Sequence, residues 1–360
     1  MTLPLSRRAF ALSALSIAAT GMAPAVQAQP DAWPARPVKL VVPFPPGGGT
    51  DLVARAVGQK LAERLKQAVV IDNRPGASTI IGSDAVAKAA PDGYTLLLSG
   101  STSYTVNPAL RSKLPYDPLR DLAPILIVAR TPLVLVVNAD KPWRHVNDLI
   151  AAAKAKPRSL HYATFGPGSA PHLAGELFAL AAGVQLQDVP YKGSAQAAMA
   201  LMGGEIDLAV DTVPSAAPHI KSGKLRALGI VGSTRASLLP GIPTLGELQL
   251  PEAVFDGWYA LSAPRQTPPA IIDQLARETT AAMADPALQA QLRNQGMEPV
   301  AIGAAMFRQM MEQEISRYRA LAHRASIVVE CTDPQRVERP PRYAATPCKK
   351  PAGRGLFAWG

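Results

Sequence analysis

The sequence has little cysteine and no long hydrophobic run in its body. Cys331 and Cys348 are the only cysteines among 360 residues, and both lie near the C-terminus. Residues 29–330 therefore supply no thiol nucleophile, no cysteine-based metal site and no disulfide. Beyond the N-terminal segment, no stretch holds the about 18 consecutive apolar residues that a membrane-spanning helix needs. The histidines show no His-Glu-x-x-His spacing, so we expect neither a metal nor another cofactor.

A concentrated basic surface is also missing. The formal net charge is +10, yet residues 1–28 and 331–360 contribute +6 of it. A protein that binds nucleic acid usually gathers its lysines and arginines on one element, and the body has no such block. We therefore expect no nucleic-acid partner. A mildly basic body is compatible with small anionic ligands.

The two ends of the chain differ from the body. Residues 1–28 are typical of an export signal, because Arg7 and Arg8 precede an apolar run over residues 9–23 and a small-residue cleavage site follows. The paired arginines fit a twin-arginine signal, and a general secretory signal fits them equally well. Residues 331–360 are rich in proline and arginine and lack apolar periodicity, so we expect a disordered tail.

Between the ends, short β-branched runs alternate with Ala- and Leu-rich helical patterns. This alternation is typical of a parallel sheet that helices cover on both faces. It resumes after Arg130, so the sequence predicts two α/β halves. We expect strands over 38–42, 68–71, 95–98, 133–137, 160–163, 206–210 and 225–231, and helices over 51–66, 83–90, 146–154, 171–182, 195–202, 269–283, 288–294 and 304–324.

The body contains three glycine-rich segments that each precede a predicted helix. They are residues 45–51, 164–171 and 190–194, and each supplies glycine followed by a threonine or serine suited to an N-cap. The first turn of a helix leaves backbone N–H groups unpaired at the positive end of the helix dipole. Glycine lets the backbone approach a ligand closely. Such segments are typical of small anion sites.

A carboxylate fits these segments better than a phosphate does. The first segment lacks the Gly-Lys-Ser/Thr ending of a phosphate loop and contains no Gly-x-Gly-x-x-Gly fingerprint. Asp51 at the helix start would repel a polyanion, although it also has a simpler role as a favourable first-turn acid. An enzyme that used these segments as oxyanion holes would need an activated nucleophile. The body has no cysteine and no Gly-x-Ser-x-Gly elbow, so we predict binding without catalysis.

Longer motifs resemble a known family. Residues 33–51 read Trp-Pro-Ala-Arg-Pro-Val-Lys-Leu-Val-Val-Pro-Phe-Pro-Pro-Gly-Gly-Gly-Thr-Asp. Further motifs lie at residues 72–77, 90–96, 114–118, 162–173, 189–194, 214–227, 240–244 and 257–259. Together they strongly resemble the substrate-binding proteins of tripartite tricarboxylate transporters, the Bug family, over residues 31–330.

The resemblance implies a fold and a function. It implies a two-lobed α/β periplasmic binding protein, type II-like, whose lobes close about a hinge. Residues 31–132 and 256–330 would form lobe 1, and residues 133–255 would form lobe 2. The protein would be a periplasmic monomer that captures a small carboxylate-bearing solute for the membrane permease subunits of the transporter. A solute sensor feeding a membrane regulator and a hydrolase using the same anion sites remain alternatives.

The resemblance also implies which residues bind the ligand. Backbone amides, hydroxyls and waters would hold the carboxylate, without an arginine clamp. Lobe 1 would supply Phe44, Gly48, Gly49, Thr50 and Asp51, with Ser101 and Thr102 beside them. Lobe 2 would supply Gly166, Gly168, Ser169 and His172, with Tyr191, Lys192, Gly193 and Asp211 nearby.

The sequence departs from the family pattern in two places. Residues 78–82 read Ser-Thr-Ile-Ile-Gly where Gly-Gly-Asn-Ile-Gly is usual, which changes the surface of lobe 1. Residue 165 is Phe where a small or polar residue is more common, and residue 167 is Pro. Both replacements predict a narrower pocket with fewer hydrogen-bonding groups.

Overall fold

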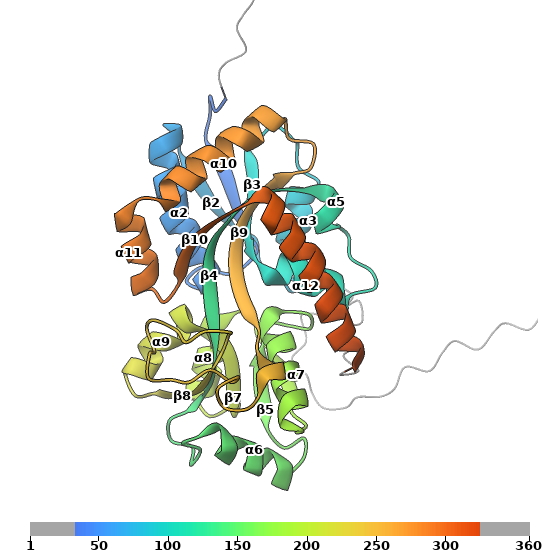
Figure 1. The fold of residues 1–360 in the computed structure, drawn as a ribbon, viewed down its shortest axis with the longest axis vertical. Helices are drawn as coiled ribbons and strands as arrows, with labels where there is room; N and C mark the ends of the chain where they lie inside the picture. The colour runs from blue at the N-terminus through green and yellow to red at the C-terminus, as the bar shows by residue number, and fades with distance from the viewer. Residues whose placement is uncertain (1–32, 325–360) are drawn as a thin grey trace, which may run out of the picture.

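The computed structural model describes residues 33–324, which form two lobes stacked along the long axis of the molecule (Figure 1). The predicted export signal at residues 1–28 and the predicted tail at residues 331–360 lie outside the described residues. The two-lobed α/β fold expected from the sequence is confirmed. Each lobe places helices around its own part of a curled sheet.

Within residues 33–324, ten strands form this sheet. Lobe 1 contains β1 (Val38–Val42), β2 (Val69–Asn73), β3 (Thr95–Gly100), β9 (Asp256–Pro264) and β10 (Glu298–Gly303), and lobe 2 contains β5 (His161–Thr164), β6 (Gln187–Pro190), β7 (Leu208–Thr212) and β8 (Leu225–Val231). β1 pairs in parallel with β2 and β3, and β5 pairs in parallel with β6 and β7. These parallel strands match the strand–helix alternation of the sequence.

One long strand, β4 (Leu122–Asn138), joins the two lobes. It pairs antiparallel with β9 and β10 in lobe 1 and with β7 and β8 in lobe 2. The sequence predicted a strand only over residues 133–137. Pro124 and Pro132 interrupt the pattern, since proline cannot donate to a strand ladder, and the register against β9 shifts between Pro124 and Leu126.

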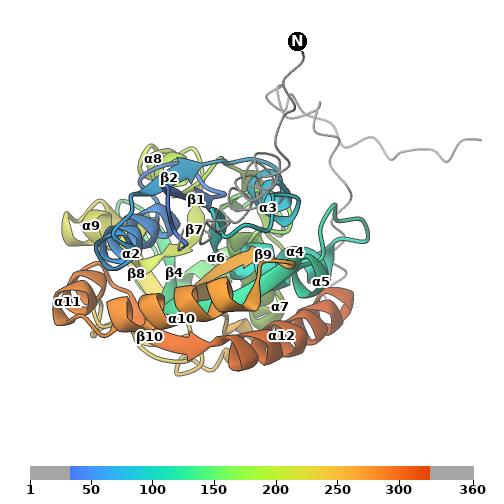
Figure 2. The same cartoon turned by 90° about the horizontal axis from the view of Figure 1, so that it is seen from above.

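The helices cover the sheet in both lobes. They are α2 (Gly49–Leu65), α3 (Ile80–Ala87), α4 (Asn107–Leu110), α5 (Pro118–Asp121), α6 (Val146–Ala155), α7 (Ala170–Ala182), α8 (Ser194–Met202), α9 (Val213–Lys221), α10 (Pro269–Met283), α11 (Pro286–Asn294) and α12 (Ala304–Arg324). A π-helical turn (Thr102–Val106) precedes α4. Seen from above, α10, α11 and α12 lie along one side of lobe 1 (Figure 2).

Helix α12 fastens lobe 1 to the crossing between the lobes. Trp258 at the start of β9 stacks on Tyr104 at 5.6 Å between ring centroids, and Phe307 of α12 packs edge-on against both rings. Such aromatic pairs add about 0.5–1.5 kcal/mol each beyond the area they bury. The Glu314 carboxylate also accepts the Trp258 indole N–H at 3.0 Å. These contacts anchor the start of β9 to the helices of lobe 1.

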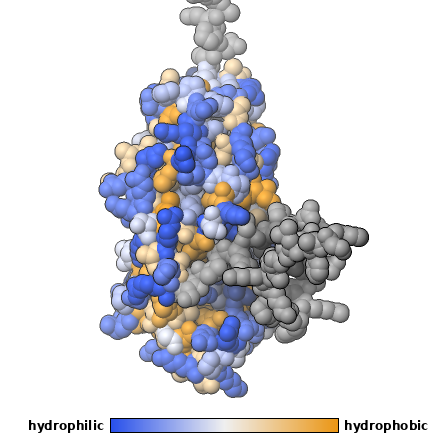
Figure 3. Space-filling model, turned by 90° about the vertical axis from the view of Figure 1, so that its right-hand side faces the viewer, coloured by the Kyte–Doolittle hydropathy of each residue, from blue (hydrophilic) through white to orange (hydrophobic). Residues whose placement is uncertain are grey.

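The outer surface carries both hydrophilic and hydrophobic residues. Hydrophilic residues dominate the face in Figure 3, and hydrophobic residues appear between them as separate patches. The large exposed hydrophobic side chains Val70, Ile81, Met199 and Met306 come from four different elements or loops. In the span from residue 33 to residue 324, no helix has the length and apolar character needed to cross a bilayer.

Candidate functional site

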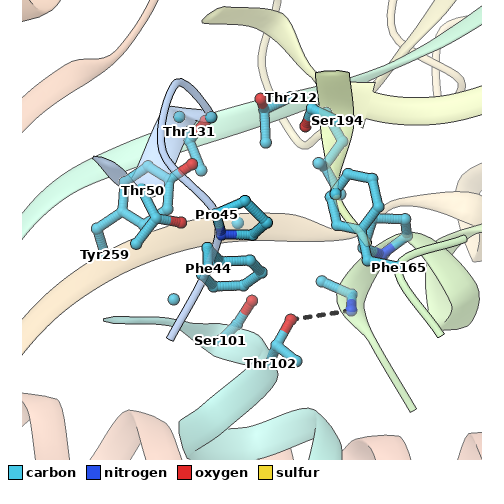
Figure 4. Close-up of a pocket in the computed structure, with 18 of the residues that line it drawn as sticks. Phe44, Pro45, Thr50, Ser101, Thr102, Thr131, Phe165, Ser194, Thr212 and Tyr259 are labelled. Atoms are coloured by element: carbon cyan, nitrogen blue, oxygen red, sulfur yellow. Dashed lines mark hydrogen bonds between the residues drawn. The ribbon is translucent and has the colours of Figure 1, made fainter. Parts of the chain in front are cut away.

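A cavity of about 300 Å³ lies between the lobes. This volume is at the lower end of the range for small-molecule sites. Of the predicted site residues, Phe44, Gly48, Gly49, Thr50, Ser101, Thr102, Lys192 and Gly193 line it, whereas Asp51, Gly166, Gly168, Ser169, His172, Tyr191 and Asp211 do not. In the close-up, Thr50 and Tyr259 lie on one side and Phe165 on the opposite side, with Phe44 between them (Figure 4).

The start of α2 presents backbone donors to the cavity. Gly48 is the N-cap and contributes no side-chain capping bond, and Gly49 and Thr50 form the first turn and line the cavity. First-turn N–H groups have no intrahelical acceptor. A methyl group at Gly49 would lie 2.6 Å from the Tyr259 hydroxyl and 3.2 Å from Thr212 Oγ1. Glycine therefore lets the helix start lie against the Tyr259 hydroxyl and close to Thr212 of lobe 2.

Asp51 shapes the α2 start from behind. It is 2% exposed, and its carboxylate accepts hydrogen bonds from Gly47 N–H at 3.0 Å, Arg55 Nε at 2.9 Å and Asn73 Nδ2 at 3.0 Å. Burial alone would raise the pKa of Asp51, but these hydrogen bonds outweigh it and lower the pKa. The side chain is therefore ionised, and its hydrogen bonds stabilise the glycine-rich loop before α2.

The start of α8 faces the same cavity from lobe 2. Ser194, Ala195 and Gln196 form its first turn and line the cavity. None of the backbone N–H groups from Gly193 to Gln196 donates to an acceptor within the described part of the chain. The N-cap residue Gly193 has φ +154° and ψ −178°, a conformation that is essentially restricted to glycine.

Asp211 supports the α8 start without lining the cavity. Its Oδ1 atom accepts the Ser194 hydroxyl at 2.7 Å and the Thr212 N–H at 2.7 Å. Burial raises the pKa of Asp211 to about 6, and the two hydrogen bonds lower it only partly. The residue therefore titrates within the range of ordinary buffers.

The start of α7, which the sequence also predicted to bind an anion, has no backbone N–H group without an acceptor in the described chain. Pro167 and Pro171 have no N–H. The other backbone N–H groups each have an acceptor: Phe165 donates to Ser169 Oγ, Gly166 to Thr164 Oγ1, Gly168 to His172 Nδ1, Ser169 to Gly166 O, Ala170 to Thr102 Oγ1, His172 to Ser169 Oγ and Leu173 to Ser169 O. No donor of this turn is left for a ligand.

One of these hydrogen bonds crosses between the lobes. Ala170 N–H of α7 donates to Thr102 Oγ1 of lobe 1 at 3.0 Å, as the dashed line in Figure 4 shows. Beside it, the Ser78 hydroxyl of lobe 1 donates to Pro167 O at 3.0 Å and lies 3.3 Å from Phe165 O. The Arg111 guanidinium also donates to Pro167 O. We call these contacts the interlobe latch.

The hydroxyls of the cavity complete its polar side. Thr131 is 3% exposed and lines the cavity, where its hydroxyl lies beside that of Tyr259. Burial raises the pKa of Tyr259 to about 12, so its hydroxyl stays protonated and able to donate.

Lys192 is the one charged side chain among the described lining residues, and it is exposed. In residues 33–324 no group of three His, Cys, Asp or Glu side chains could hold a metal.

The predicted site did not include several lining residues that come from the crossing strands and from lobe 2. They are Thr131, Leu133, Phe255, Gly257, Trp258 and Tyr259 at the crossings, and Ala170, Pro171, Ser194, Ala195, Gln196 and Thr212 in lobe 2. The resemblance predicted the two lobe crossings near residues 131–133 and 255–258, so these residues were expected at the crossings and were not assigned to the site.

Comparisons with known proteins agree with this geometry. The model of the tripartite tricarboxylate transporter family receptor matches residues 53–327. The chain is 41% identical to protein BugT of Bordetella pertussis over 312 residues, which cover 86% of this chain and 95% of BugT.

Solved structures share the fold over nearly their whole length. Rpa4515 of R. palustris, determined with adipate, superposes with a TM-score of 0.80 at 35% identity and covers 83% of this chain and 100% of its own. MatC from Rhodopseudomonas palustris, determined with bound malate, superposes with a TM-score of 0.77 at 30% identity and covers 80% of this chain and 99% of its own.

Proposed function

Because this chain belongs to the receptor family of the tripartite tricarboxylate transporters, we propose that it captures a small carboxylate-bearing solute between its lobes. The loaded protein then delivers the solute to the membrane permease subunits of such a transporter. Export to the periplasm by the predicted signal is part of this proposal. The relatives determined with adipate and malate support a carboxylate as the bound group.

The observation that carries this function is the pair of helix starts in opposite lobes. The first-turn N–H groups of α2 and of α8 face one cavity. Each start places partial positive charge there, and a bound carboxylate accepts hydrogen bonds from both. The hydroxyls of Thr50, Thr131 and Tyr259 donate to its remaining lone pairs. No arginine is needed, because backbone donors and hydroxyls supply the hydrogen bonds.

Closure of the lobes follows from the same geometry. The ligand brings the α2 and α8 starts together, and the interlobe latch holds the closed form on the α7 side. The chain passes from lobe 1 to lobe 2 along β4 and returns into β9. Two crossing strands of this kind are typical of a hinge.

Catalysis is not part of the proposal. The Ser169 hydroxyl accepts the backbone N–H groups of Phe165 and His172, and His172 Nδ1 accepts the N–H of Gly168. Burial lowers the pKa of His172. The imidazole nitrogen that accepts from Gly168 is therefore neutral and occupied, and it cannot take a proton from Ser169. This arrangement argues against the hydrolase alternative.

Calorimetry against a panel of carboxylates tests the proposal. We expect at least one small carboxylate to bind the purified chain with one-to-one stoichiometry, while its amide or methyl ester binds much more weakly. Recovery of the ligand unchanged after prolonged incubation is the second expected result. Absence of binding across mono-, di- and tricarboxylates, or conversion of the ligand to a product, would contradict the proposed function.

A further inference from the structure

Resting on the proposed function, we infer that the ligand is a monocarboxylate with a compact apolar body of about the size of one ring. Three features of the cavity lead to this ligand class: a single anion-binding corner, an apolar remainder and a closed second helix start.

The anion-binding groups converge on one corner. A methyl group at Gly49 would lie 3.2 Å from Thr212 Oγ1 of lobe 2, and one at Gly193 would lie 3.4 Å from Pro45 of lobe 1. The α2 and α8 starts are therefore neighbours, and they form one site instead of two sites at opposite ends. The exposed Lys192 directly precedes α8, so the only charged lining residue among those described lies at this same corner.

A buried hydroxyl also lines the cavity. Thr131 is 3% exposed, and its hydroxyl lies beside that of Tyr259. A ligand oxygen in this cavity can accept hydrogen bonds from such hydroxyls.

The rest of the cavity is apolar. Phe44, Pro75, Leu133, Phe165, Pro171 and Phe255 supply its walls. Phe165 is only half-buried and faces Phe44 across the cavity (Figure 4). Aromatic walls favour a planar or cyclic body by offset stacking. The Ser101 hydroxyl is available for one neutral polar atom of that body.

A second carboxylate finds no free backbone donor at the α7 start. The natural place for it is the α7 start, but every N–H from Phe165 to Leu173 is absent or already bonded, and Ala170 is bonded to Thr102 of the other lobe. A carboxylate buried against the phenyl rings without donors would lose its hydration and gain little in return. The cavity of about 300 Å³ has room for a body of one ring.

Calorimetry on the purified chain with four probes tests this ligand class. Benzoate and cyclohexanecarboxylate represent the inferred class, and adipate and malate represent the dicarboxylates. We expect the tighter of the ring monocarboxylates to bind at least roughly tenfold more tightly than either dicarboxylate, since the second charge is desolvated without a partner. Tighter binding of adipate or malate overturns the inference and leaves the proposed function intact. Failure of all four probes together with the wider panel overturns both.

Phe165 variants separate specificity from folding. Phe165→Ala removes the aromatic wall, and we expect it to weaken binding of the ring monocarboxylate by roughly tenfold while its effect on the dicarboxylates is small. Phe165→Leu keeps an apolar wall, so it recovers most of the affinity. Circular dichroism and the melting temperature report whether each variant folds. An equal loss for both ligand classes with an unchanged melting temperature contradicts a role for Phe165 in specificity.

Discussion

The helix starts of α7 and α8 carry the same sequence cue and serve different purposes. Both lie in lobe 2, and both follow glycine and precede an Ala-rich helix. At α8, four consecutive N–H groups from Gly193 to Gln196 face the cavity without an acceptor in the described chain. At α7, the N–H groups are bonded within the turn or to Thr102 of lobe 1. One start is built for a ligand and the other for the interlobe latch.

A glycine-rich helix start can bind a ligand only when no acceptor within the protein already occupies its backbone N–H groups. Two prolines remove donors at α7, and the Ser169 and His172 side chains accept others. At α8 the Ser194 hydroxyl donates to Asp211 and therefore does not cap its own helix. A free donor set, and not the glycine itself, distinguishes a binding start from a structural one.

We expect the largest effect on ligand affinity from a substitution at Gly193. Its φ of +154° is unfavourable for any residue with a Cβ, so Gly193→Ala displaces the α8 start. We expect binding to weaken by roughly tenfold or more, in line with the about 1–3 kcal/mol cost of such a conformation. Gly204→Ala at the other end of α8 has φ +75° and no atom near its Cβ. This control should lose stability and retain affinity, as calorimetry and thermal melting will show.

A paired test separates the two helix starts by their serine and threonine side chains. Thr50→Ala removes a hydroxyl from the cavity, and we expect affinity to fall by about 1 kcal/mol or more. Ser169→Ala removes the N-cap of α7, and we expect the free energy of unfolding to fall by about 1 kcal/mol with little change in affinity. Affinity lost in Ser169→Ala and retained in Thr50→Ala would reverse the assignment of the two starts.

Removing one hydrogen bond of the interlobe latch should reduce ligand affinity by a smaller amount. Ser78→Ala removes the partly buried hydroxyl that donates to Pro167 O, and a neutral hydrogen bond contributes about 0.5–1.5 kcal/mol. We expect a severalfold loss of affinity, and small-angle scattering should show a more open ligand-free chain. Ser159→Ala on the outer surface of lobe 2 is the matched control. Unchanged scattering and affinity would mean that the latch does not influence closure.

The smallest expected effect is a pH dependence of ligand affinity that comes from Asp211 beside the α8 start. The pKa of Asp211 is about 6 in the free protein, and a carboxylate bound nearby raises it further, because like charges disfavour ionisation. The bound form then holds more protons, so affinity falls as the pH rises from 5.5 to 8. We expect a change of about twofold to fourfold, with proton uptake visible when calorimetry is repeated in buffers of different ionisation enthalpy.

Asp211→Asn tests this assignment. The variant keeps an oxygen that accepts the Ser194 hydroxyl, and it cannot titrate. We expect its affinity to be independent of pH between 5.5 and 8. A pH dependence that persists in the variant would assign the titrating group elsewhere.

Much of the fold followed from sequence patterns, and in lobe 2 the predicted residues Lys192 and Gly193 line the cavity, whereas those predicted at the α7 start do not. The strand over residues 38–42 and the helices over 269–283 and 304–324 match the structure at both ends, because their periodicity is local. β4 was predicted at less than half its length, since its two prolines break the pattern and its pairing partners lie far away in the chain. The α2 start was predicted two residues late, because Gly48 and not Thr50 is the N-cap.

The use of the α7 start could not be read from the sequence. Its decisive hydrogen bond joins Ala170 to Thr102, which are 68 residues apart and in different lobes. Asp51 illustrates the same limit, because its role depends on Asn73 and Arg55 meeting behind the loop. Local motifs indicate where donors can occur, and the tertiary contacts decide which donors remain free.

A crystal structure with the tightest-binding carboxylate tests the central claim most directly. We predict that the carboxylate oxygens lie within hydrogen-bond distance of the backbone N–H groups of both α2 and α8, with Ala170 still bonded to Thr102. A carboxylate held instead at residues 166–169, or outside the cavity between the lobes, would contradict the account.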